Sequence, residues 1–415
     1  MATIAENLKT IKDSTTAIKQ AIIDKGGTIE GNLTTYASAI ANLPSGGGDV
    51  NPTAEKNDVT FYDYDGTILY SYTAEEFLAL TEMPPLPTQK GLICQEWNWA
   101  YEDAREYVTE YGVLNVGATY ITDDGKTRLY IRIAAKGRMD VPLYFQQTVA
   151  NGVTIDWGDG TPTQTLNGTG KVNATHRYAS IGDYCITLDV AEGCTLTLGN
   201  GNNINVIGGS SSVYRRMLYK AEIGARITGL DYSFQNMDAL RSVSIPTTAK
   251  NSSISAFQYC KMLNAVIIPT GTQGGLNNWL NQSYICIVVF CSQKTNISTM
   301  MRDCPYLQSV VLPPNLVSII GYQFYNDTSL TSLIIPKKVT DIGAYAMTYC
   351  SGMAFIDFSR HTAVPTLANT NAFTGIPEDC KIIVPDALYD TWIAATNWST
   401  YASYIIKKSD WDNLQ

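Results

Sequence analysis

Charged residues are scarce in this sequence, and histidine is almost absent. Asp, Glu, Lys and Arg together make up 16% of the 415 residues, and the formal net charge is −9. A chain without a basic excess lacks the positive footprint that contact with nucleic-acid phosphates requires, so we expect no nucleic-acid partner. The two histidines, His176 and His361, are too far apart in the sequence to form a local motif.

Long apolar runs are also missing. The longest, Tyr284–Phe290, is far shorter than the ~20 residues that span a bilayer, so we expect no membrane insertion. The first residues do not place an apolar segment after a basic one, and we expect no signal peptide. The nine cysteines show neither CxxC nor mixed Cys/His spacing, which predicts reduced thiols and no metal centre.

Acidic residues are lacking where a hydrolase would need them. No glutamate occurs between residues 224 and 377, and residues 239–302 contain no acidic residue at all. Glycoside hydrolysis uses two carboxyl groups about 5 to 10 Å apart, and only Asp303 and Asp327 could meet on neighbouring repeats. No phosphate-binding glycine loop or Ser/His/Asp motif stands out. We therefore expect no enzymatic activity and no cofactor.

Polar and aromatic residues are abundant instead. Apolar residues make up 45% of the chain, enough for real hydrophobic cores, and 26 residues are tyrosine. A nearly neutral, tyrosine-rich surface is typical of adhesive and fibrous proteins. The length predicts two to four domains. The patterns below predict a multidomain, mainly β protein.

The N-terminal residues 1–43 carry a heptad pattern. Apolar or small residues alternate at spacings of four and three, which predicts a coiled-coil stalk. Isoleucine at every d position disfavours a parallel dimer and favours a trimer or tetramer, of which we expect a homotrimer. The alternative is an amphipathic helix packed on its own chain. A glycine-rich linker, residues 44–58, follows. The predicted oligomerisation residues are Ile4, Leu8, Ile11, Thr15, Ile18 and Ile22.

Residues 59–118 are predicted to form a small α+β module. Asp63-Tyr-Asp-Gly66 is typical of a hairpin turn, and Thr73-Ala-Glu-Glu76 is a capping box at a helix start. Trp97-Asn-Trp99 precedes a second helix, which we expect over residues 102–111 with Gly112 at its end. Such a module could bind a ligand or act as a spacer, and the sequence does not choose between these roles.

Residues 119–193 resemble a PKD-type β-sandwich. The resemblance rests on the turn in Val153–Gly160, which contains Trp-Gly-Asp-Gly, and on the strand pair in His176–Leu188. It implies a spacer or binding fold without catalysis. Asp156 and Asp159 could bind calcium. The stronger expectation is that glycines permit the turn, that Asp159 accepts hydrogen bonds from its backbone amides, and that His176 is a structural strand residue.

A motif L-x-x-V-x-I-P recurs through the C-terminal half. We call the first residue of each copy its leading residue. A bulky apolar residue stands six places before most leading residues, and Met, Cys or Asp stands three places before them. The clear copies are Leu240–Pro246, Leu263–Pro269, Leu307–Pro313 and Leu330–Pro336, and weaker copies are Leu218–Gly224, Tyr284–Phe290, Met353–Ser359 and Asp379–Pro385. The pattern resembles the BspA-like (Treponema pallidum type) leucine-rich repeat.

That resemblance implies a solenoid over residues 194–385, in which stacked coils bury one apolar column. Cys260, Cys304 and Cys350 then lie two coils apart, roughly 9–10 Å at sheet spacing. A disulfide needs Cα atoms within about 7 Å, so these cysteines are predicted to be free thiols in the core. Residues 386–415, with Trp392 and other aromatic residues, are predicted to cap the end of the solenoid.

Two surfaces of the solenoid are predicted to make contacts. The residues four places before each leading position are candidate receptor contacts, although an ordinary solvated turn explains them as well: Asn236, Tyr259, Asp303, Asn326 and Tyr349. The residue between the inward V and I of each repeat should point outward. These form an apolar stripe, which we expect a neighbouring subunit or a receptor to cover; simple β-propensity is the alternative. The stripe comprises Ile267, Val288, Val311 and Ile334, with Ser244 and Asp357 at its ends.

The whole arrangement resembles a virion protein of a phage that infects gut bacteria. The stalk sequence and the Asp63–Gly66 module resemble segments of such phage and prophage proteins. The resemblance implies a tail fibre or similar appendage, made in the host cytoplasm and acting outside it. Its partners would be itself, other virion proteins, and a glycan or protein on the bacterial surface. A bacterial or prophage-encoded adhesin is the alternative.

Overall fold

The computed structural model describes residues 58–199, 201, 203–251, 254–272 and 276–414. Residues 57–415 form one compact unit, and the account below concerns this unit. The predicted coiled-coil positions, the predicted linker up to residue 57 and their oligomeric state lie outside the described residues. None of the helices in the described part of the chain has the length and apolar character needed to cross a membrane.

The first module is a four-stranded sheet with two helices. The strand order is β2-β1-β4-β3, with β1 and β4 parallel. Thr73 and Glu76 form the predicted capping box, and α4 ends at Gly112 with φ 74°. Strand β4 runs four residues past the predicted boundary at 118. The elements are β1 (Val59–Tyr62), β2 (Ile68–Tyr72), α3 (Ala74–Ala79), β3 (Leu92–Trp97), α4 (Tyr101–Tyr111) and β4 (Leu114–Thr122).

A two-sheet β-sandwich follows the module. One sheet has the order β14-β12-β5-β10-β7-β8 and the other β13-β11-β6-β9. Phe145 and Trp157 are fully buried in its core. Its strands are β5 (Thr127–Ile133), β6 (Asp140–Gln147), β7 (Val153–Asp156), β8 (Gln164–Thr165), β9 (Gly170–Arg177), β10 (Gly182–Val190) and β11 (Leu196–Leu198), with a 3-10 helix at Lys136–Arg138.

The sandwich and the solenoid share strands and a core. Strand β12 (Leu218–Glu222) pairs antiparallel with β5 and parallel with β14, and β13 (Ile227–Gly229) pairs parallel with β11. One continuous core of buried side chains runs from Leu129 to Ile405. The predicted boundary at residue 193 therefore does not separate two cores. The sandwich covers the first coil, as the open end of a solenoid requires.

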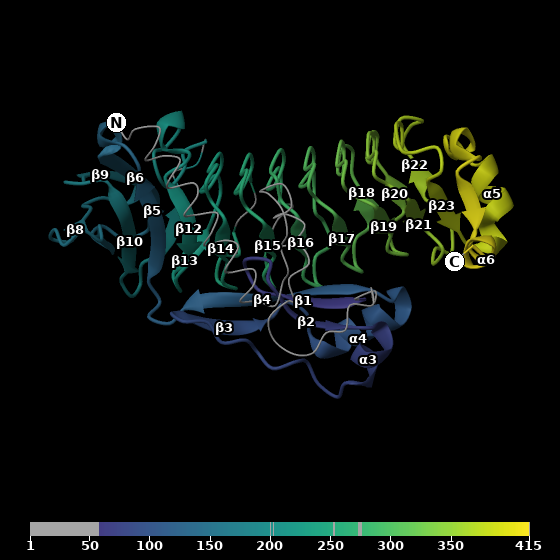
Figure 1. Ribbon diagram of the computed structural model, residues 1–415, viewed down its shortest axis with the longest axis horizontal. Helices are drawn as coiled ribbons and strands as arrows, with labels where there is room; N and C mark the ends of the chain where they lie inside the picture. Colours follow the sequence, from purple (N-terminus) through teal and green to yellow (C-terminus); the bar gives the residue numbers. More distant parts are fainter. Residues whose placement is uncertain (1–57, 200, 202, 252–253, 273–275, 415) are drawn as a thin grey trace, which may run out of the picture. The chain divides into compact units, whose positions relative to one another are not determined.

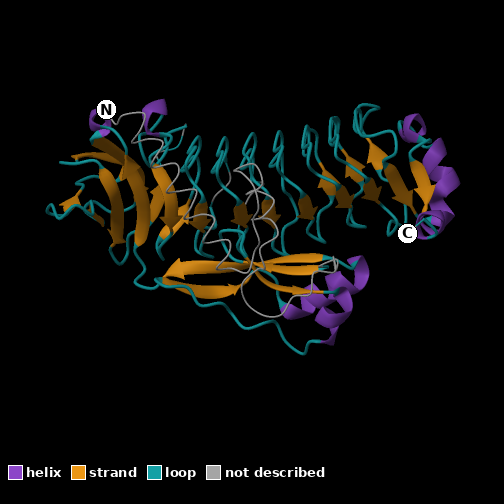
Figure 2. Cartoon of the chain, in the orientation of Figure 1, coloured by secondary structure: helices purple, strands orange, loops and turns teal. Residues whose placement is uncertain are grey.

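The solenoid carries one row of short parallel strands, which Figures 1 and 2 show side by side along its length. A second, shorter row consists of β18 (Ser318–Ile319), β20 (Asp341–Ile342) and β22 (Thr366–Leu367). The first row comprises β14 (Ser242–Ser244), β15 (Ala265–Ile267), β16 (Ile287–Val289), β17 (Ser309–Val311), β19 (Ser332–Ile334), β21 (Phe355–Asp357), β23 (Lys381–Val384) and β24 (Ile405–Lys407).

The strand register corrects one repeat. Val266 pairs with Val288, and Val288 pairs with Val310. The weak copy therefore begins at Ile285 rather than Tyr284. As a result Val288 belongs to the buried core, and Val289 takes the outward place that the sequence assigned to Val288. The error arose because this copy has Cys291 where clear copies have proline, so the sequence offered no marker for its end.

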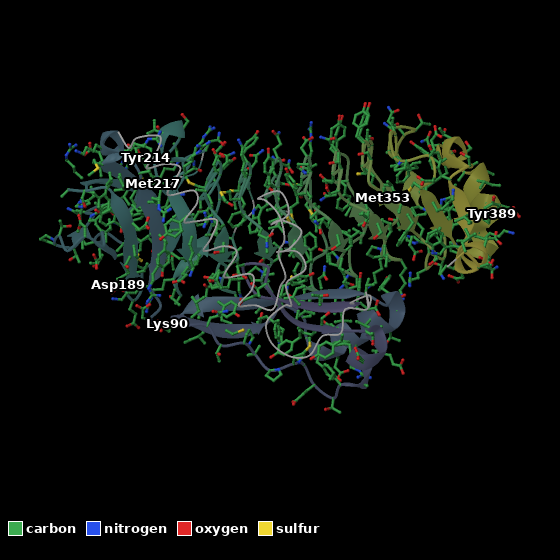
Figure 3. All side chains as sticks on the ribbon, viewed as in Figure 1. Lys90, Asp189, Tyr214, Met217, Met353 and Tyr389 are labelled. Atoms are coloured by element: carbon green, nitrogen blue, oxygen red, sulfur yellow. The ribbon has the colours of Figure 1, made fainter. Side chains whose placement is uncertain are left out.

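The C-terminal segment closes the solenoid as predicted. Trp392 and Trp398 are fully buried and contact Phe358, which belongs to the last coils. Figure 3 shows Tyr389 at this end of the molecule, beyond Met353. Although Asp386 is an acidic residue just before a helix, it does not cap α5, because its carboxylate accepts the amide of Ser409. The elements are α5 (Tyr389–Ala394), a 3-10 turn at Trp398–Tyr401 and α6 (Lys408–Asp412).

Candidate functional site

The predicted core cysteines lie in the solenoid interior as free thiols. All nine cysteines of the chain are unpaired, and Cys260, Cys304 and Cys350 have no exposed surface. Each donates its S–H to a carbonyl of the preceding coil, at 2.9 to 3.1 Å. Burial raises the pKa of Cys260 to about 12. A thiol that is both buried and protonated is a poor nucleophile, so this column fills space.

The Trp-Gly-Asp-Gly turn has the structural role that the sequence favoured. Gly158 and Gly160 have φ of 75° and 82°, and the Asp159 carboxylate accepts the Thr161 amide. His176, on β9, stacks on Trp157, and its Nε2 lies 2.7 Å from Asp159. Although burial opposes it, the hydrogen bonds from Thr161 and His176 lower the pKa of Asp159 to about 2.

No group of three potential metal-ligating side chains is found within the described residues. Of the two aspartates on neighbouring repeats, Asp327 has no exposed surface, and its Oδ1 accepts the amide of Cys304. Asp303 pairs with Arg302 and accepts a hydrogen bond from Asn326. These two carboxylates therefore do not face a common substrate.

The outward stripe lies beneath the chain's own α+β module. In the observed register it comprises Ile267, Val289, Val311 and Ile334, and we call it the outer stripe. Ile267 is 4% exposed and Val289 is fully buried. Val311 and Ile334 pack against the module's core. The sequence analysis assigned this face to a second subunit or a receptor, but an intramolecular partner occupies it.

Polar contacts specify how the module docks. The Asn98 amide donates to the carbonyls of Ile268 and Val289, and the Trp99 indole donates to Phe290. Farther along the row, the Tyr107 hydroxyl donates to the Leu312 carbonyl. These acceptors lie at or just after the ends of β15, β16 and β17. Figure 1 shows the module's sheet beside this row of strands.

The predicted receptor column proves to be a ladder of turns. All five residues, Asn236, Tyr259, Asp303, Asn326 and Tyr349, have positive φ, between 57° and 63°. Each donates its backbone N–H to a carbonyl of the next coil, at 2.7 to 3.1 Å. Gln282, which stands three places before Ile285 rather than four, has the same conformation, with φ 58°, and donates its N–H to the Arg302 carbonyl. Asparagine and aspartate tolerate this region of backbone space, whereas tyrosine does so at a cost.

Two residues of that column, Asp303 and Asn326, adjoin a cluster of tyrosines, and a third, Tyr349, belongs to it. A pocket of about 320 Å³ opens on the loop edge of the last coils, and we call it the tyrosine pocket. Tyr322 and Tyr345 stack with ring centres 4.9 Å apart, and Tyr325 meets Tyr349 edge-on. The lining residues are Tyr322, Tyr325, Tyr345, Thr348, Tyr349, Asn371 and Thr374.

A charged pair supports one wall of the tyrosine pocket. The Arg302 guanidinium lies over the rings of Tyr322 and Tyr325, at 5.2 and 5.1 Å from their centres. Its Nε is 3.1 Å from the carboxylate of Asp303. Asp303 in turn accepts a hydrogen bond from Asn326 of the next coil. The rings are thereby held in place before any ligand arrives.

A recurring tyrosine in the sequence is a signal for this pocket. Tyr322 and Tyr345 stand eight places before the leading residues Leu330 and Met353 and share a second positive-φ position, with φ of 62° and 59°. A tyrosine that recurs at one repeat position falls on one face of a solenoid. Asn371 and Thr374 lie beyond the clear repeats and could not be placed from the motif.

Comparison with known proteins identifies the repeat. Residues 229–354 match the BspA type leucine rich repeat region in six copies. The chain therefore carries a BspA-like leucine-rich-repeat region. None of the curated proteins matches the chain.

Two solved structures are similar in part. One is a leucine-rich repeat protein from Bacteroides ovatus, with 18% identity and a TM-score of 0.27 over 40% of this chain and 54% of that protein. The other is the pneumococcal vaccine antigen PcpA, with 14% identity and a TM-score of 0.22 over 46% of this chain and 66% of the antigen. The chain thus spans about half to two thirds of these proteins.

Proposed function

We propose that the chain is a non-enzymatic attachment protein that binds a ligand on a bacterial surface through the tyrosine pocket. The pocket carries the proposal. Tyrosine offers a large, rigid and amphipathic contact area at low entropic cost, which is why it is enriched in binding surfaces. Four tyrosines from two adjacent coils meet here, Tyr349 is 50% exposed, and Arg302 holds two of the rings.

As its setting we propose a virion appendage of a phage, with the bacterial adhesin as the alternative. The heptad of residues 4–22 and the resemblance of the stalk to phage segments favour the virion. BspA-like repeats in bacterial surface adhesins favour the alternative. Mass spectrometry separates the two, because the chain would be found in purified virions in the first case and on the producing bacterium in the second.

The binding experiment uses the labelled full-length chain and a panel of gut bacteria. We expect the parent to bind at least one strain, and Tyr345→Ala/Tyr349→Ala to bind it at least about tenfold more weakly, a loss of ~1.4 kcal/mol. Tyr345→Phe/Tyr349→Phe keeps the rings and is the matched control. We also expect no new reducing ends when the chain is incubated with polysaccharide from that strain. Equal binding by the alanine variant and the parent would contradict the assignment of the pocket.

A further inference from the structure

A second group of exposed side chains lies on the coils that precede the tyrosine pocket. Met262, Tyr284 and Tyr306 each stand directly before the leading residue of a coil, and the three coils are consecutive. They are 49%, 41% and 52% exposed. The rings of Tyr284 and Tyr306 meet edge-on with centres 5.0 Å apart. A single exposed apolar residue is ordinary, but three in register form a continuous surface.

The segment from Arg302 to Tyr306, two turns on either side of the buried Cys304, connects this group to the tyrosine pocket. At its start, Arg302 lies over Tyr322 and Tyr325 of the following coil, and at its end Tyr306 contacts Tyr284 of the preceding coil. Between them, Asp303 accepts a hydrogen bond from Asn326. Four consecutive coils therefore carry exposed or half-buried tyrosines, over roughly 14 Å at sheet spacing.

The charges of this edge exclude some ligands. The faces of Tyr322 and Tyr325 already hold the Arg302 guanidinium, so a second cation would meet a like charge there. Asp303 balances Arg302 at 3.1 Å, so the pair offers no net positive charge to an anion. Charge therefore gives no reason to prefer an ionic ligand.

The tyrosine hydroxyls of the pocket indicate which kind of ligand fits there. In the part of the chain that the structure describes, the hydroxyls of Tyr322, Tyr325 and Tyr349 donate to no other protein group. The Asn371 amide donates to the Tyr345 hydroxyl, at 3.2 Å, and so orients it. The exposed parts of the Tyr322 and Tyr349 rings, beside these free hydroxyls, match a molecule that has apolar C–H groups and many hydroxyls of its own. A saccharide has both.

We propose that a neutral saccharide chain binds along the coil axis, across the tyrosine pocket and the Tyr284–Tyr306 pair. The inference rests on the proposed function, because it names the ligand of the same surface. The pocket holds one end of the saccharide, and the pair extends the contact to the neighbouring units. A short sugar reaches the pocket alone, whereas a polymer reaches both.

Affinity gel electrophoresis of the full-length chain tests this inference. The gels contain dextran, mannan or galactan as neutral polymers, polygalacturonate as a polyanion, or chitosan as a polycation. We expect at least one neutral polymer to retard the parent, and Tyr284→Ala/Tyr306→Ala to raise the dissociation constant for that polymer about tenfold. Tyr284→Phe/Tyr306→Phe, which keeps the rings, should migrate like the parent. Tyr284 and Tyr306 are both exposed, so neither variant should unfold the protein, and thermal unfolding verifies that each variant folds.

Titration with a disaccharide of the same polymer separates the two subsites. The alanine pair at 284 and 306 should leave its affinity unchanged, while Tyr345→Ala/Tyr349→Ala should abolish it. Three outcomes would overturn the inference. The parent could be retarded only by chitosan or polygalacturonate, or by none of the polymers, or the Tyr284→Ala/Tyr306→Ala variant could be retarded as strongly as the parent. If the chain binds bacteria through the pocket but no polymer retards it, only the saccharide inference is contradicted. If a polymer retards the chain but it binds no bacterium, the proposed attachment function is contradicted.

Discussion

At the scale of single residues, Asp327 stands where three other coils carry cysteine. Its side chain is fully buried, and burial raises the pKa of its carboxyl well above the ordinary value. Oδ1 accepts the Cys304 amide, but Oδ2 has no hydrogen-bond partner among the described residues. A buried acceptor without a partner costs about 1–3 kcal/mol. This position therefore weakens an otherwise regular column.

Replacing this residue in Asp327→Cys should make the protein more stable at neutral pH, by about 0.5–2 kcal/mol. The parent holds a proton on Asp327 over the range in which the unfolded chain has lost it. Its stability therefore falls as the pH rises above the unfolded pKa of about 3.9. The advantage of the variant should thus grow as the pH rises above about 4, as measured by thermal unfolding. Thr331→Ala, an exposed change on the same coil, is the control. An advantage that stays constant with pH would show that Asp327 ionises without cost.

At the scale of elements, strand β4 of the module lies so close to the outer stripe that only glycine fits at one point. A Cβ atom at Gly117 would lie 2.4 Å from Cγ2 of Ile267. The Gly117 amide also donates to the Asn98 side chain, whose own amide donates to the carbonyls of Ile268 and Val289. The glycine, the asparagine and the stripe therefore form one docking contact.

We expect Gly117→Val to lower the free energy of unfolding by about 1–3 kcal/mol, because the added side chain displaces Ile267 or the module. Ile267→Ala makes room, so the double variant should recover part of that loss. Denaturant unfolding of both single variants and the double variant measures this coupling. Gly137→Val is a matched control, since a Cβ there meets no atom within 4 Å. Strictly additive effects would mean that the two residues do not meet.

At the scale of the whole molecule, the outer stripe no longer argues for oligomerisation, because the module already covers it. The prediction of a homotrimer rests on the heptad of residues 4–22 alone. We expect the full-length chain to sediment as a trimer at micromolar concentration. A shortened chain that begins at Val59 should sediment as a monomer with the same thermal transition. A monomeric full-length chain, or a trimeric shortened one, would contradict the role of the heptad.

The sequence by itself determined the local, repeating features. The spacing of Leu240, Leu263, Leu307 and Leu330 set the coil length, because each coil must place its leading side chain in the same apolar column. The free core cysteines followed from the same spacing. The capping box and the turns followed from chemistry within a few residues. The Ile285 coil was misplaced by one residue, because no proline marks its end.

Tertiary structure alone decided what covers the outer stripe and which tyrosines meet. Asn98 bonds a carbonyl 170 residues away, and Arg360 reaches Glu110 across 250 residues. A periodic pattern indicates that a face is apolar but not which segment will bury it, since that depends on shape and on long-range hydrogen bonds. The tyrosine pocket likewise needs Asn371 and Thr374, which follow the clear repeats. Their place is set by how the chain stacks as it leaves the last regular coil, and no residue spacing encodes that.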